Sequence, residues 1–277
     1  MGTRLLHIFR NTPLGRETLF QSAYFCKQTG FSLVIYIPRF KKFLMYFKND
    51  AVQVDLDDSY LVAHKTAEVH AKEITESLGI EPVFIQEDAF TASTLPDIPS
   101  DFDFMCCPRS ISDMSSKVSL GHIGSPVRRI VRSAKFPILI TSPVFKPWKS
   151  IAVMFGGSRN SVKALKLGFR MARKTGMPLD IFTQIEKPST RKEYKAIVTS
   201  KNFDKNLSTY LHHWYLFEKH QFEENLYDVP HDALVVLGAY GHGVIKDILF
   251  GSKMETIQST LSNNLLVVGP KYSQVNR

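Results

Sequence analysis

Residues 234–269 run LVVLGAYGHGVIKDILFGSKMETIQSTLSNNLLVVG, and this stretch decides the predicted fold. The apolar runs at 234–237 and 265–268 have the length and composition of buried strands. Glycines follow the first run, and Gly251-Ser252 then opens a segment with apolar residues at helical spacing. The stretch therefore predicts, in succession, a strand, a glycine loop, a helix N-terminus and a second strand.

The glycine loop has a composition suited to binding phosphate. Glycines let backbone N–H groups approach an anion closely, because no Cβ lies in the way. A helix that begins at Ser252 directs unpaired N–H groups and partial positive charge to the same place. His242 can add a donor and Lys253 a positive charge, although an exposed loop histidine and a solvent-facing lysine fit the sequence as well. We therefore expect the phosphates of a nucleotide at this loop.

The spacing G-x2-G-x9-G-S, formed by Gly238, Gly241, Gly251 and Ser252, resembles the nucleotide loop of the universal stress protein (UspA-like) family. The resemblance covers nearly the whole chain, and it is strong in the second half and partial in the first. It implies a nucleotide-responsive binding or signalling module of the stress response, with ATP or AMP as ligand and Mg²⁺ accompanying ATP. The cofactor-binding residues that it implies are Gly156, Gly157, Gly238, Gly241, His242, Gly243, Gly251, Ser252 and Lys253.

The two halves of the chain repeat each other. Residues 5–12 align with residues 151–158, and Gly124-Ser125 aligns with Gly251-Ser252. A proline-containing linker at 142–150 separates the copies. The sequence thus predicts a tandem repeat of two domains, 1–145 with an insertion near 39–55, and 149–277.

Short apolar strands alternate with helical segments in both halves, which predicts an α/β fold with parallel sheets covered by helices on both faces. The family resemblance implies two doubly wound, five-stranded sheets of order 3-2-1-4-5, Rossmann-like and similar to adenine-nucleotide α-hydrolases. It also implies an intramolecular pseudo-dimer of the two domains. The expected strands are 5–9, 31–37, 83–86, 104–107, 136–141, 151–155, 179–183, 214–218, 234–237 and 265–268. The expected helices are 17–28, 57 or 58 to 79, 126–134, 161–175, 191–211 and 222–227. Thr12 is the expected N-cap of the first helix and Gly30 its end, whereas Asn202 and Asp204 weaken the middle of the helix at 191–211.

Two positions depart from the family pattern. Nucleotide-binding members carry an Asp after the first strand, where this chain has Gly156 in the second half and Arg10 in the first. Losing a charged hydrogen-bond acceptor costs about 1.5–3 kcal/mol, or about 10- to 100-fold in affinity. Because Pro108 and Arg109 replace the first loop glycines, we expect no ATP in the first half. Arg10 and Arg109 are then either holders of another anion or surface arginines without a ligand.

Composition narrows the remaining functions. The chain has 277 residues and a net charge of +9, but its basic residues are spread out and form no nucleic-acid-binding motif, so we expect no specific nucleic-acid partner. No apolar run approaches the roughly 20 residues of a transmembrane helix, and we expect no signal peptide. Three cysteines do not form a disulfide framework, which favours a cytoplasmic location. The sequence does not decide whether the chain forms a homodimer.

The sequence supplies no catalytic set and no metal site. His212, His213 and His220 are too close in sequence to point one way. At most, the slow ATP hydrolysis known in parts of the family is expected. A structural or interaction protein without nucleotide is the alternative function, and an enzyme of the α-hydrolase type is a third. The basic and aromatic segment 39–48 is interpreted as a packed insertion, a partner surface or a membrane-surface contact, in that order.

Overall fold

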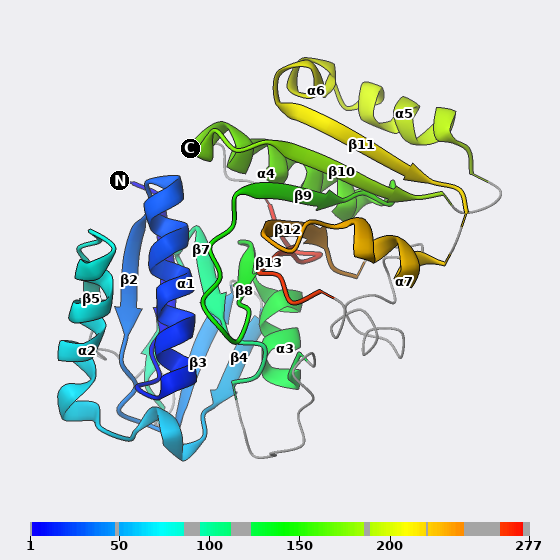
Figure 1. Cartoon of the computed structure of the whole chain (residues 1–277). Helices are drawn as coiled ribbons and strands as arrows, with labels where there is room; N and C mark the ends of the chain where they lie inside the picture. The colour runs from blue at the N-terminus through cyan, green and yellow to red at the C-terminus, as the bar shows by residue number, and fades with distance from the viewer. Residues whose placement is uncertain are drawn as a thin grey trace. The chain divides into compact units, whose positions relative to one another are not determined.

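The computed structural model describes residues 2–47, 50–85, 95–111, 123–185, 189–219, 221–240 and 261–273. The chain forms two compact units, unit 1 (Met1–Lys146 with Lys271–Arg277) and unit 2 (Pro147–Pro270) (Figure 1). The last residues group with unit 1, in contrast to the expected domain 149–277, because Ser273 N–H donates to Lys135 O and Lys271 Nζ pairs with Asp50. In the described parts of the chain, no helix has the length and apolar character needed to cross a bilayer.

Unit 1 is built on a parallel sheet. Its strands are β1 (Arg4–Ile8), β2 (Ser32–Tyr36), β5 (Val83–Ile85), β7 (Phe104–Cys107) and β8 (Ile138–Ile140). They pair in the order β8-β7-β1-β2-β5, so that Leu5 of the central strand lies between Leu33 of β2 and Phe104 of β7. Three of the four strand pairings in this sheet involve β1 or β7, and the apolar side chains of these two strands are buried. The predicted α/β class of this half is confirmed.

The helices of unit 1 are α1 (Pro13–Thr29), α2 (His64–Ser77) and α3 (Ser125–Ser133). Thr12 caps α1 by accepting the N–H of Gly15, and Gly30 ends it in the left-handed region at φ 69°, as predicted. The prediction of one helix from 57 or 58 to 79 is wrong at its start. Asp57 instead caps the short 3₁₀ helix η1 (Asp58–Tyr60), and a turn separates η1 from α2.

The segment 39–55 is a packed insertion. Its strands β3 (Lys42–Phe47) and β4 (Asp50–Asp55) form an antiparallel pair, and β6 (Asp97–Ile98) adds a parallel strand to β3. Alternate side chains of the pair are buried in unit 1, as expected for a sheet with one face on the core. Two of its lysines pair with nearby carboxylates, at 2.5 Å for Lys41–Asp58 and 3.7 Å for Lys42–Asp55. The paired strands and their buried side chains agree with the first of the three interpretations of this segment, a packed insertion.

Unit 2 contains a second parallel sheet. Its strands are β9 (Ser150–Met154), β10 (Leu179–Gln184), β11 (Leu211–Phe217), β12 (Ala233–Gly238) and β13 (Leu265–Val268), paired in the order β11-β10-β9-β12-β13. The two apolar runs of residues 234–269 are thus the neighbouring strands β12 and β13, with every residue buried. The helix predicted after Ser252 lies outside the described residues.

The helices of unit 2 are α4 (Arg159–Thr175), α5 (Arg191–Ser200), α6 (Asp204–Tyr210) and α7 (Phe222–Asn225), the last continued by the 3₁₀ helix η2 (Leu226–Asp228). The single helix predicted over 191–211 is therefore interrupted, because Asn202 takes a left-handed φ of 58° between α5 and α6. Strand β11 begins at Leu211, which pairs with Leu179, and therefore starts earlier than the predicted residue 214. Helix α4 contacts β9, β10 and β12, and it also contacts α6.

Candidate functional site

The carboxyl ends of β9 and β12 lie side by side in unit 2. The two strands are parallel neighbours, with Val153 opposite Val236, and they end at Met154 and Gly238. From β9 the chain continues through α4 to β10 on one side, whereas β12 lies on the other side. Ligands of doubly wound sheets bind at such a point, where the winding direction reverses. The loops that follow β9 and β12 therefore define the candidate site.

The loop after β9 leads directly into helix α4. Gly157 has a φ of 71°, a left-handed conformation that a residue with a Cβ rarely adopts. A Cβ at Gly157 would also lie 3.1 Å from Ile197 Cδ1 of α5. Ser158 then caps α4 by accepting the N–H of Ser161 at 3.1 Å. Gly157 therefore sets both the direction of the loop and its closeness to α5.

Gly238 has a packing role at the end of β12. A Cβ built on it would lie 2.5 Å from the carbonyl carbon and oxygen of Asn160, in the first turn of α4. Asn160 Nδ2 donates to Ala239 O at 2.7 Å and so fixes the same approach. Gly238 thus lets the strand end and the helix N-terminus meet, whether or not a ligand is present.

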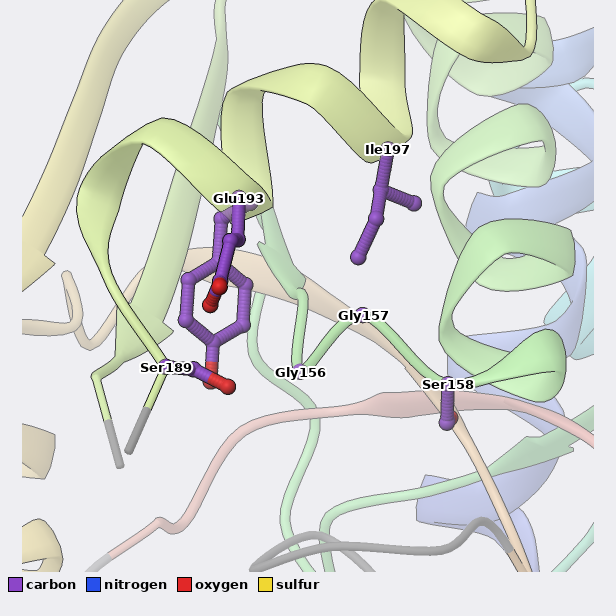
Figure 2. Close-up of a pocket in the computed structure, with 7 residues that line it drawn as sticks. Gly156, Gly157, Ser158, Ser189, Glu193 and Ile197 are labelled. Atoms are coloured by element: carbon purple, nitrogen blue, oxygen red, sulfur yellow. The ribbon is translucent and has the colours of Figure 1, made fainter. Parts of the chain in front are cut away.

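A cavity of about 230 Å³ opens beside the β9–α4 loop (Figure 2). Figure 2 shows Glu193 and Ile197 projecting from α5 toward the loop formed by Gly156 and Gly157. Polar groups, backbone and apolar side chains all contribute to the wall, which is lined by Gly156, Gly157, Ser158, Ser189, Glu193, Tyr194 and Ile197.

Aromatic packing supports the wall of this cavity. The buried ring of Tyr194 meets that of Phe155 edge to face, with centroids 6.5 Å apart, and Phe155 meets Trp214 in the same way at 6.1 Å. Trp214 Nε1 donates to Thr183 Oγ1 at 3.0 Å, which ties this group to β10. The loop after β9 thus rests on side chains from α5, β10 and β11.

Sequence reasoning located part of this site. Gly156 and Gly157 line the cavity, and Gly238 ends the neighbouring strand. It missed Ser189, Glu193, Tyr194 and Ile197, for which the only signal was the i, i+4 spacing of 193 and 197 on one helix face. The other predicted residues lie outside the described part of the chain: Gly241, His242, Gly243, Gly251, Ser252 and Lys253.

The corresponding position in unit 1 is taken by a side chain. Arg10 follows β1, and its guanidinium lies 3.5 Å from Asp57 Oδ2 with both side chains largely buried, 13% and 11% exposed. Arg10 Nε also donates to Ser59 Oγ, and its guanidinium lies over the Tyr60 ring, 5.4 Å from the centroid. Arg10 is thus engaged by η1 and its cap, and it is not a surface arginine.

Arg109 lies after β7 in unit 1 and is also buried. Burial lowers the pKa of its guanidinium to about 10. Of the two alternatives left open for Arg109, the surface arginine without a ligand is therefore wrong. The sequence showed only that Arg109 stood where the second half has glycine, and it contained no signal for its burial.

The described histidines and acids do not gather into a metal site. Within the described ranges, no group of three or more His, Cys, Asp or Glu side chains could hold a metal ion. His212 Nδ1 instead lies 3.0 Å from Asp180 Oδ1, across the pair of strands β10 and β11. His213 contacts the Tyr215 ring on the same strand, with ring centroids 4.3 Å apart.

The architecture defines the class of protein: a two-unit α/β protein with doubly wound parallel sheets and a cavity beside the β9–α4 loop. Sequence and structure comparisons then show which known proteins the chain resembles. The chain is 27% identical over 188 residues to the universal stress protein Slr1230 of Synechocystis, a match that covers 66% of this chain and 63% of that protein. No family model matches the sequence.

Solved structures of universal stress proteins share the fold of nearly the whole chain. One from Archaeoglobus fulgidus has a TM-score of 0.62 at 16% identity, covering 96% of this chain and 98% of that one. A putative one from Pseudomonas aeruginosa has a TM-score of 0.56 at 12% identity, covering 98% and 94%. The chain is thus similar in sequence to one universal stress protein and shares the fold of others, and its length fits a tandem two-domain layout.

Proposed function

We propose that this chain is a nucleotide-responsive module of a stress response, and that it binds ATP or AMP in unit 2. The observation that carries the proposal is the cavity beside Gly156 and Gly157, in the loop that follows β9. Ligands of doubly wound sheets bind at the carboxyl ends of the strands, where the winding direction reverses. Residues 238–243 and 251–253 would hold the phosphates, with Mg²⁺ accompanying ATP. Each compact unit corresponds to one universal stress protein domain, in the cytoplasm.

Unit 1 has no role as a nucleotide site in this proposal. Its equivalent position holds Arg10, which pairs with Asp57, where nucleotide-binding relatives have an Asp. Binding of one nucleotide per chain is therefore expected. We assign no catalytic residue and expect at most slow ATP hydrolysis.

A second candidate function is an interaction protein that binds no nucleotide. The observation that favours it is Gly156, which leaves the β9–α4 loop without the carboxylate of nucleotide-binding relatives. Under this alternative, the glycine loop only makes the turn between β12 and the next element, and Gly238 only allows packing against α4.

Isothermal titration of ATP, ADP and AMP into the full chain distinguishes the two. We expect micromolar binding at about one site per chain, lost in Gly251→Val with an unchanged circular dichroism melting curve, because a valine blocks backbone approach to phosphate. The matched control is Gly124→Val, at the equivalent position of unit 1, which should retain binding. If millimolar nucleotide produces no binding heat and no thermal shift, nucleotide binding is refuted and the interaction protein remains as the function.

A further inference from the structure

We infer that Glu193 of α5 supplies the carboxylate that residue 156 lacks, and that it accepts hydrogen bonds from the ribose hydroxyls of the nucleotide. This inference rests on the proposed function, and it makes unit 2 selective for ribonucleotides. Glu193 is a specificity-determining residue in this assignment, because it recognises the sugar and leaves the phosphates to the glycine loop.

Helix capping places Glu193 at the cavity. Thr190 and Glu193 form a capping box at the start of α5, in which Glu193 Oε2 accepts the N–H of Thr190 at 2.9 Å. This bond fixes the carboxylate at the first turn of the helix. Glu193 Oε1 accepts no hydrogen bond from any residue that the structure describes, and the side chain is exposed. One carboxylate oxygen is therefore available to a ligand while the other holds the helix.

The same side chain borders the loop that lacks an acid. Glu193 lines the cavity together with Gly156 and Gly157, and Figure 2 shows it projecting from α5 toward them. The cation next to Thr190 does not neutralise it, because Arg191 Nε pairs with Glu218 Oε1 at 2.5 Å. A carboxylate thus reaches the cavity from α5, where nucleotide-binding relatives supply one from the loop.

The size and lining of the cavity fit part of a nucleotide. Its volume of about 230 Å³ is smaller than the roughly 300–1,000 Å³ of pockets that enclose a whole small ligand. Tyr194 and Ile197 give it an apolar side, and Ser158 and Ser189 add hydroxyls to its wall. This combination suits a sugar ring with its hydroxyl groups more than a charged phosphate.

Charge selects the ribose as the partner of Glu193. A carboxylate only accepts hydrogen bonds and repels phosphate, so it requires donors. The two neighbouring hydroxyls of ribose are such donors, and acidic side chains hold ribose hydroxyls in the dinucleotide sites of other doubly wound sheets. A charge-assisted bond of this kind corresponds to about a tenfold or greater change in affinity.

Titration of ATP and 2′,3′-dideoxy-ATP into the full chain and Glu193→Gln tests the assignment. Glutamine keeps the capping box, because it also occurs at this position of the motif, so the variant should fold. The wild-type chain should bind ATP about tenfold more tightly than the dideoxy analogue, and Glu193→Gln should lose that preference by weakening ATP alone. The matched control is Glu223→Gln, which removes the same charge from the first turn of α7 and should leave both affinities unchanged.

The outcomes separate this inference from the proposed function. A wild-type chain that binds neither compound would refute the nucleotide site itself. If the wild-type chain binds ATP and Glu193→Gln binds it equally well or more tightly, the nucleotide site stands and the role of Glu193 is refuted. Equal weakening of ATP and its dideoxy analogue in Glu193→Gln would show that the carboxylate does not recognise the ribose hydroxyls.

Discussion

At the scale of single residues, His7 is the buried group with the clearest effect on stability. It lies in β1 with 1% of its surface exposed, and its Nδ1 is 2.8 Å from Ser22 Oγ. Its Nε2 is buried and has no hydrogen-bond partner among the described residues. Burial lowers the pKa of the imidazole from 6.5 to about 3, because the core does not solvate the charged form.

The sign of this shift predicts a loss of stability in acid. Because the folded state favours neutral His7, its contribution is complete above the unfolded pKa of 6.5 and is lost as the pH falls toward about 3. When the pH falls from about 7.5 to about 5.5, protonation of His7 in the unfolded state should lower the free energy of unfolding by about 1.4 kcal/mol. Urea unfolding of the wild-type chain and His7→Leu should show this difference in pH dependence. Equal pH dependence in both proteins would contradict a buried neutral imidazole.

Single residues also show how far the sequence predicts the site. The family resemblance implied Gly156 and Gly157 as binding residues, and the structure places them in the loop after β9. The sequence did not separate the packing role of Gly238 from a ligand role, since its neighbour Asn160 lies far away in sequence. Glu193 was not predicted at all. Only the crossover from β10 to β11 brings α5 to the cavity, and no local pattern records that contact.

At the scale of elements, the strand pair β3–β4 shows how an insertion becomes part of the core. Phe43, Met45 and Phe47 of β3 are buried, whereas Tyr46 between them is 43% exposed. Strand β4 contacts α3, which connects β7 to β8. The inward side chains of β3 therefore contribute to the stability of unit 1.

This alternation predicts opposite results for two neighbouring positions of β3. Met45→Ala should lower the unfolding free energy by about 2–5 kcal/mol, because it removes fully buried sulfur and methylene groups and leaves a cavity in their place. Tyr46→Ala, the control, should cost less than about 1 kcal/mol, because Tyr46 is 43% exposed and leaves no cavity in the core. Urea unfolding followed by circular dichroism measures both. A larger loss in Tyr46→Ala would contradict the packed insertion.

The sequence predicted elements with regular patterns better than it predicted breaks. Periodicity located α1, α4 and β7, whose boundaries follow from caps, glycines and apolar runs. Between α5 and α6 it marked Asn202 as a weak point of the helix but did not predict a complete break, which the left-handed backbone of Asn202 makes without a proline or glycine. The strands of segment 39–55 were also missed, since the apolar run at 43–47 does not alternate with polar residues and so hides the two faces of the strand.

At the scale of the whole molecule, the two units carry different natural probes. Both tryptophans, Trp148 and Trp214, belong to unit 2, and all three cysteines belong to unit 1. Each cysteine is a buried free thiol: Cys26, Cys106 and Cys107. Burial raises the pKa of the Cys26 thiol, so it reacts with labelling reagents only after unfolding. Tryptophan fluorescence and thiol labelling therefore report the two units separately.

These probes predict where nucleotide acts. A ligand at about 100 times its Kd adds about 2.7 kcal/mol to the unfolding free energy of the unit that holds it. ATP should therefore move the urea midpoint of tryptophan fluorescence upward and leave the midpoint of thiol labelling unchanged, with neither shift in Gly251→Val. A delay in thiol labelling without a change in fluorescence would place the nucleotide in unit 1 and contradict the closed Arg10–Asp57 position. Equal shifts of both midpoints would contradict separate unfolding, because stabilisation of unit 2 would then reach the thiols of unit 1.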